Sequence, residues 1–156
     1  MSERKRPSKL QVWMDMADKK AERSHDAETK VGCILINNES EAEIAMGYNG
    51  FVRGASDKDL PNKRPDKYQY MVHAEQNLMA NCARHGISME NCTVVCTMSP
   101  CVTCMRLLFQ AGITRVIVKE KYRDFEKLKK MKDLEIEEKQ TPEGFWELRY
   151  KVYDDK

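Results

Sequence analysis

The chain contains 156 residues, of which 41% are hydrophobic and 33% are charged, and its net charge is only +2. This composition is typical of one globular domain with its own apolar core, and it excludes a largely disordered chain. No apolar run reaches the roughly 18–20 residues of a membrane span, and no secretory signal follows the basic N-terminus. We therefore expect a cytoplasmic protein (in the host cytoplasm if a virus encodes it) with no membrane partner, and the balanced charge argues against a nucleic-acid partner.

The first half of the chain predicts one helix, two strands and a long loop. Apolar residues near the N-terminus recur at the spacing of one helical face, and Ser8 with Gln11 forms a capping pattern. Two apolar, β-branched runs predict a hairpin, and a polar stretch containing Gly and Pro predicts a long connection of the kind that is often functional. These elements occupy residues 8–23 (helix), 31–37 and 43–48 (strands) and about 49–70 (loop).

The second half predicts helices and strands in alternation and ends in a hairpin. Ser99 and Pro100 are typical of a helix start, and Gly86 and Gly112 of helix ends. The expected elements are residues 73–85 (helix), 93–97 (strand), 101–111 (helix), 114–119 (strand), 124–131 (helix), and 134–139 with 145–153 (hairpin). This order predicts an α/β fold, a three-layer α/β/α sandwich around a mixed sheet of about five strands. We expect a single domain over residues 1–156, with a core at about 8–131 and a C-terminal β-hairpin extension at 132–156.

Three side chains in two segments have the chemistry of a metal site. His73 offers an imidazole, and Cys101 and Cys104 offer two sulfurs at the start of a predicted helix, where the helix dipole favours thiolates. This set suits zinc, and three protein ligands leave a fourth position for water. Zinc lowers the pKa of bound water to roughly 7, and a carboxylate beside it, Glu75, can carry the proton to a substrate nitrogen.

The spacing of these residues favours catalysis over the other uses of a C-x-x-C pair. Such a pair alone is also typical of buried thiols or of a redox site, but no βαβ unit precedes this one. Together, His73, Glu75, Pro100, Cys101 and Cys104 match the H-x-E…P-C-x-x-C pattern of zinc-dependent deaminases, with 27 residues between His73 and Cys101.

Further motifs between about residues 10 and 122 extend this match. They are Ser24-His25-Asp26, Val31-Gly32-Cys33, Gly47-Tyr48-Asn49-Gly50, Gly54-Ala55-Ser56-Asp57, Leu60-Pro61, His73-Ala74-Glu75-Gln76-Asn77, Ser99-Pro100-Cys101-Val102-Thr103-Cys104 and Gln110-Ala111-Gly112-Ile113. With these motifs the chain resembles the deoxycytidylate (dCMP) deaminase family of the cytidine deaminase-like superfamily. The Gly-Tyr-Asn-Gly segment and the Ser-Asp segment after it are what point to this branch.

The resemblance implies a zinc-dependent deamination of dCMP to dUMP and ammonia, with zinc on His73, Cys101 and Cys104 and with Glu75 as proton shuttle. It also implies substrate contacts from Asn49 (to the sugar), Tyr122 (near the ring) and Ala74. A phosphate requires cations, and the long loop offers five: Arg53, Lys58, Lys63, Arg64 and Lys67. We expect Arg53 first because it is the one nearest to Asn49.

Regulation and assembly are further implications of the resemblance. Regulation by dCTP and dTTP would involve Asn49, Ser56 and Asp57, with Mg²⁺ accompanying the nucleotide effector. Members are homo-oligomers, so we expect a hexamer or a dimer.

Several alternatives stay open at this stage. The zinc motif alone also fits a deaminase of another base or nucleoside, a deaminase of tRNA or DNA bases, or a noncatalytic zinc-binding assembly protein of the same fold. A polymer substrate requires a basic face, which the net charge does not support. A noncatalytic protein would not need the carboxylate of Glu75.

Overall fold

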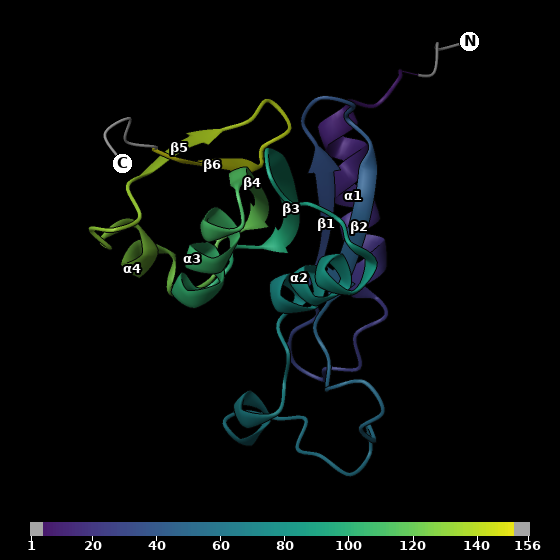
Figure 1. Ribbon diagram of the computed structural model, residues 1–156. Coiled ribbons are helices and arrows are strands. Elements are labelled where there is room, and N and C mark those ends of the chain that lie inside the picture. The colour runs from purple at the N-terminus through teal and green to yellow at the C-terminus, as the bar shows by residue number, and fades with distance from the viewer. Residues whose placement is uncertain (1–4, 152–156) are drawn as a thin grey trace.

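The computed structural model describes residues 5–151, and a single mixed sheet runs through it (Figure 1). The strand order is β2-β1-β3-β4-β6-β5, and only β3 and β4 are parallel. The strands are β1 (Gly32–Asn37), β2 (Glu43–Tyr48), β3 (Cys92–Met98), β4 (Ile113–Glu120), β5 (Ile136–Gln140) and β6 (Trp146–Tyr150). The helices are α1 (Lys9–Ala21), a 3₁₀ turn (Asp66–Gln69), α2 (Ala74–His85), α3 (Val102–Gln110) and α4 (Phe125–Lys129).

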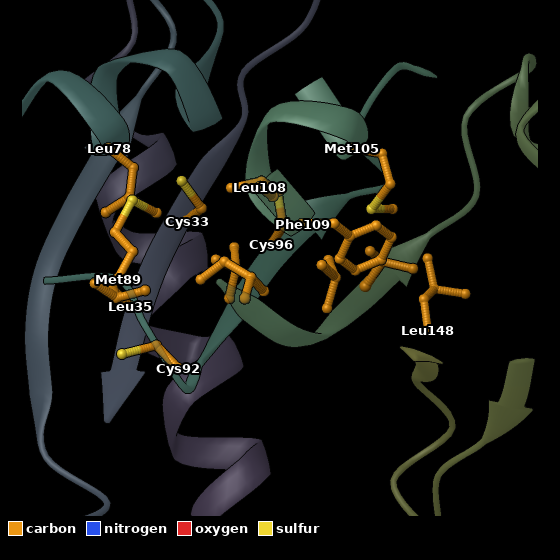
Figure 2. Packing of buried hydrophobic residues seen from close by; sticks show 14 of the residues in the cluster. Cys33, Leu35, Leu78, Met89, Cys92, Cys96, Met105, Leu108, Phe109 and Leu148 are labelled. Carbon is orange, nitrogen blue, oxygen red and sulfur yellow. The ribbon is translucent and has the colours of Figure 1, made fainter. Parts of the chain in front are cut away.

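Side chains alternate along the central strands and so fill two apolar layers. On β1, Ile34 packs with α1, whereas Cys33 and Leu35 belong to the larger cluster beneath α2, α3 and α4. Figure 2 shows part of this larger cluster, with Leu78 of α2 and Met105 of α3 above the strands. Helices therefore cover both faces of the sheet, and the predicted α/β/α sandwich is confirmed.

Two glycines allow the helices to lie close to the sheet. A Cβ atom on Gly32 would collide with the backbone oxygen of Ala17 in α1. A Cβ atom on Gly47 would lie 2.6 Å from the backbone oxygen of Ala74 in α2. Because Gly47 has no side chain, the first turn of α2 packs directly against β2.

The predicted C-terminal hairpin is present, but it is part of the main sheet. Strand β6 pairs with β4, so the sheet has six strands where about five were expected. Phe145 and Leu148 are buried in the two apolar layers, and Leu134 is buried just before the hairpin. Residues 152 and 153 of the predicted strand lie outside the described residues. Within residues 5–151, none of the helices has the length and apolarity needed to cross a lipid bilayer.

Candidate active site

The first turns of α2 and α3 meet at the end of β3. The two ends of the long loop before α2 are joined by an antiparallel bridge, in which Gly50 N–H donates to Val72 O at 3.0 Å and Val72 N–H donates to Gly50 O at 2.7 Å. His73 directly follows this bridge and is the N-cap residue of α2. The Gln76 side-chain oxygen accepts a hydrogen bond from the His73 backbone N–H at 2.9 Å. Cys101 caps α3 and accepts from the Cys104 N–H at 3.4 Å. Both predicted helices are present and begin one residue after the predicted ranges, but Ser99 was wrong as the N-cap of α3, because Cys101 takes that position.

The three expected ligands lie together. His73 Nδ1 is 3.3 Å from Cys104 Sγ and 3.7 Å from Cys101 Sγ, and ligand atoms of all three residues lie within 4.8 Å of one another. Zn–S bonds of about 2.3 Å and Zn–N bonds of about 2.0–2.1 Å place the ligand atoms of a tetrahedral zinc about 3.5–3.8 Å apart. The spacing of the three side chains therefore fits a zinc ion.

The electrostatics of the two thiols also suit a cation. Their mutual hydrogen bond lowers the pKa of Cys101 to about 4, helped by His73, and raises the pKa of Cys104. The hydrogen bond to Cys101 in turn raises the pKa of His73. A dication held by these residues would keep both thiols ionised, in place of the proton that the two sulfurs share.

Glu75 lies in the first turn of α2 and is only 4% exposed. Burial raises the pKa of its carboxyl, because a charge is disfavoured away from water. The Cys96 thiol, on β3, donates to Glu75 Oε1 at 3.2 Å. Cys33 lies directly opposite Cys96 on β1, and its thiol donates to Ala74 O at 3.3 Å. Figure 2 shows both cysteines within the packed cluster. We call His73, Glu75, Cys101 and Cys104 the metal end of the site.

A cavity of about 130 Å³ opens from the metal end. Ala74, Asn49 and Tyr122 line it, as expected of substrate contacts. The Asn49 amide is engaged within the protein, however: its oxygen accepts from Val31 N–H at 2.9 Å, and its nitrogen donates to Thr29 O at 2.9 Å. Asn49 thus holds the cavity wall in place.

A buried ion pair completes this wall. Lys67 Nζ donates to both carboxylate oxygens of Asp26 at 2.9 Å, and both side chains are almost fully buried. Asp26 Oδ2 also accepts from the Asn49 amide at 3.3 Å. We call Asp26, Asn49 and Lys67 the loop wall, because they join the segment before β1 to the loop before α2.

The remaining predicted residues lie elsewhere. Arg53, Ser56 and Asp57 are exposed on the long loop, and none of them lines the cavity. Asp57 Oδ1 lies 3.6 Å from His25 Nδ1. No role was predicted for Asp26, Tyr68 or Arg123, and Lys67 was predicted only as one of the loop cations that could bind a phosphate. Asp26 could have been noticed as a carboxylate in a turn, because it accepts from two backbone N–H groups; the others carry no local signal.

Comparisons with known proteins agree with this arrangement. Residues 7–120 match the family model described as the cytidine and deoxycytidylate deaminase zinc-binding region. The deoxycytidylate deaminase of Homo sapiens is 36% identical over 121 residues, which cover 73% of this chain and 66% of that protein. That of Saccharomyces cerevisiae is 31% identical over 140 residues, covering 84% of this chain and 44% of the yeast protein. The chain therefore matches just under two thirds of the human relative's length.

Solved structures give the same picture. The dCMP deaminase of cyanophage S-TIM5 in apo form superposes with a TM-score of 0.66 at 27% identity, over 80% of this chain and 93% of that one. The same phage enzyme, solved in complex with dCMP and dUMP, gives a TM-score of 0.65 at 26% identity, over 80% and 92% of the two chains.

Proposed function

Because the chain belongs to the family defined by the cytidine and deoxycytidylate deaminase zinc-binding region, we propose that it hydrolyses dCMP to dUMP and ammonia. One observation carries this proposal: a buried carboxylate, Glu75, lies beside a His-Cys-Cys set of zinc spacing at the end of a cavity. A noncatalytic zinc protein has no use for a buried carboxylate, whose desolvation costs stability.

Each residue of the metal end has a part in this reaction. His73, Cys101 and Cys104 would hold the ion, which when bound supplies Lewis-acid activation of water at neutral pH. Glu75 accepts one proton from water as the water oxygen bonds to C4 of the cytosine ring, and passes this proton to N3. It then takes the remaining proton from the new C4 hydroxyl and gives it to the amine, so that the C4–N bond breaks, ammonia leaves and the C4 carbonyl of uracil forms. The raised pKa of Glu75 suits both roles, since a carboxyl that titrates nearer to neutral pH can take up and return a proton.

The choice of dCMP as substrate rests on the relatives. The human and yeast relatives are deoxycytidylate deaminases, and the phage enzyme of similar fold was solved in complex with dCMP and dUMP. In this chain Asn49, Ala74 and Tyr122 line the cavity beyond the metal end, where the base and sugar would lie. Asn49, held on both sides by backbone groups, offers a fixed surface to the sugar.

Regulation, assembly and compartment are parts of the same proposal. An effector nucleotide, dCTP or dTTP with Mg²⁺, would bind at the exposed segment of Ser56 and Asp57 next to the Asn49 wall, in a homo-oligomer of two or six chains. All six cysteines are free thiols, which suits the reducing cytoplasm. Titrating each effector against rate, and measuring mass in solution, test these points.

The substrate proposal is tested by zinc content and ammonia release. We expect one zinc per chain and turnover of dCMP above that of CMP, dCTP, deoxycytidine, cytosine and a single-stranded oligonucleotide. Removing zinc with a chelator should abolish the activity, and adding zinc should restore it. An inert dCMP beside a reactive polymer or free base would show that the substrate is wrong.

A further inference from the structure

A group of cations lies on the sheet, on the face that α1 covers only in part. Helix α1 packs against β1, β2 and β3, whereas β6 and β5 extend beyond it (Figure 1). Ile117 of β4 packs with α1, and Arg115, two positions before it, faces the same side of the sheet. Arg115 lies directly opposite Arg149 of β6. Glu147 of β6 lies between Ile117 and Lys139 of β5 in the same way. We call Arg115, Lys139, Glu147 and Arg149 the sheet cluster.

One buried carboxylate contacts all three cations of the sheet cluster. Glu147 is only 3% exposed. Its Oε1 lies 3.1 Å from Arg115 Nη1 and 3.3 Å from Arg149 Nη2. Its Oε2 lies 3.2 Å from Lys139 Nζ. Burial alone would raise the pKa of Glu147, but hydrogen bonds with the three cations hold this pKa below its ordinary value. The carboxylate is therefore charged, and the sheet cluster has three positive charges and one negative charge.

The two arginines repel each other, and no further carboxylate offsets this repulsion. Like charges directly opposite one another on neighbouring strands destabilise a sheet. Glu137 lies opposite Arg149 on its other side, but it is exposed and has no cation within 4.0 Å among residues 5–151. Positive charge is in excess even when Glu137 is counted. An anion is the ligand that this arrangement favours.

The guanidinium of Arg115 is held in place from behind. Its Nε donates to Thr93 Oγ1 at 2.7 Å, and the fully buried Thr93 hydroxyl donates to Asn38 Oδ1 at 2.7 Å. Its Nη1 donates to Glu147, so Nη2 is left without a hydrogen-bond partner in the part of the chain that the structure describes. Within the same range, Nε and Nη1 of Arg149 have no partner either. The side chains of Arg149 and Lys139 are 52% and 72% exposed, so a ligand can reach these donors from solvent.

We propose that the sheet cluster binds a phosphate group of a small molecule, with Arg115 and Arg149 as paired donors and Lys139 beside them. Guanidinium groups bind phosphate through pairs of N–H donors, and an ammonium group adds a point charge. The ligand is an inorganic phosphate or the phosphate chain of a nucleotide.

The small extent of the sheet cluster argues against a polymer. A nucleic-acid backbone requires an extended stripe of cations. Here the next cation on β4, Lys119, is bound by both carboxylate oxygens of Asp18, at 2.6 and 2.7 Å, and the other border is the acidic Glu137. None of the four residues of the sheet cluster lines the cavity at the metal end, so the inference does not depend on the proposed function.

The experiment titrates zinc-loaded protein with sodium phosphate, with dCTP, and with sodium chloride at the same ionic strength. The side-chain Nε–H signals of the arginines, followed by NMR, report binding at this place alone; R149Q and R115K assign the two signals. We expect both signals to shift and saturate with phosphate and with dCTP but not with chloride or deoxycytidine. R149Q, followed through the Arg115 signal, should weaken binding by about 10–100-fold, the loss of one charged hydrogen-bonding partner.

The matched control is R106Q, because Arg106 is also an arginine with one carboxylate partner, Asp133, and lies outside the sheet cluster. It should keep the wild-type affinity. Tighter binding of dCTP than of phosphate would identify a nucleotide as the ligand, and equal affinities would identify the free ion.

Three results would overturn the site. The two signals could stay unmoved by phosphate and dCTP, which would mean that the cations serve Glu147 alone. R106Q could lose as much affinity as R149Q, which would mean that the overall charge attracts the anion. The signals could respond to an oligonucleotide but not to phosphate, which would mean that the ligand is a polymer. If R149Q folds poorly in urea denaturation, K139Q carries the conclusion, because Lys139 is the most exposed of the three cations. Each of these failures would leave the proposed function untouched.

Discussion

At the metal end, the functional side chains come from the starts of two helices, and His73 and Cys101 each form a hydrogen bond with a residue three positions away. The loop wall is built differently: Asp26 bonds to Asn49 and Lys67, which are 23 and 41 positions away. The loop wall is buried, whereas His73 and Cys101 at the metal end are only partly buried, and both regions border the same cavity. At the metal end, burial of the Glu75 carboxylate destabilises the fold and serves the reaction. In the loop wall, a buried ion pair holds two irregular segments in place.

This difference predicts opposite responses to substitution. Neutralising a charge at the metal end should cost turnover and leave the fold intact. Breaking the ion pair of the loop wall should lower the free energy of unfolding, and activity should fall only because less of the protein is folded.

The largest effect is expected for Glu75→Gln. Removing the proton carrier should lower kcat by at least about 10²–10⁴-fold, the usual contribution of general acid–base catalysis. Zinc content should not change, because the amide leaves His73, Cys101 and Cys104 in place. Since burial disfavours the charged carboxylate, the free energy of unfolding should not fall. Metal analysis, steady-state kinetics and urea denaturation measure the three quantities, and an active variant would remove the role of Glu75.

Lys67→Met should give the largest loss of stability. It leaves Asp26 buried without its cation, which typically costs about 3–5 kcal/mol. The matched control is Arg106→Met, which breaks an exposed pair with Asp133 (Nε–Oδ2 2.6 Å) and should cost about 0–1 kcal/mol. Urea denaturation of both variants gives the comparison. Similar losses in the two would mean that the loop wall does not depend on its buried ion pair.

Asp26 gives the same region a signature in pH. Burial alone would raise its pKa, but hydrogen bonds from Thr29, Lys67 and Glu28 hold the pKa below the ordinary 3.8. The folded state therefore keeps the carboxylate charged when the unfolded chain already takes up a proton. This contribution is complete above pH 3.8 and is lost as the pH falls through the lower, folded value. Asp26→Asn should flatten the acid limb of stability against pH, measured with a chelator present so that zinc release does not contribute.

The contrast between the two regions also explains what the sequence could reveal. His73, Glu75, Cys101 and Cys104 were predicted because they form short patterns at helix starts. The structure brings the three ligands together, and Glu75 lines the same cavity. The hydrogen bonds of the loop wall were not predicted, because they span tens of residues and join segments without periodicity. Asn49 was found through its motif, but its amide bonds to backbone groups were not foreseeable.

The same reasoning applies to the strands. Hydrophobic alternation predicted both strands of the C-terminal hairpin, yet nothing local in them shows that β6 pairs with β4 and closes one six-stranded sheet. Partner choice between strands depends on the whole packed core, in which Leu148 takes part.

The smallest effect concerns a hydrogen bond that joins the metal end to the core. The Cys96 thiol donates to Glu75 Oε1 at 3.2 Å, so it orients the carboxylate without touching the substrate. Cys96→Ala should lower kcat a few-fold to about 10-fold, the value of one hydrogen bond, while KM for dCMP and zinc content stay the same. Cys96→Ser keeps a donor and should recover most of the rate. Cys82→Ala removes another buried thiol of the same apolar cluster and should lower stability but not kcat. If Cys96→Ala and Cys82→Ala behave alike, Cys96 is only a packing residue, and Glu75 is positioned by α2 alone.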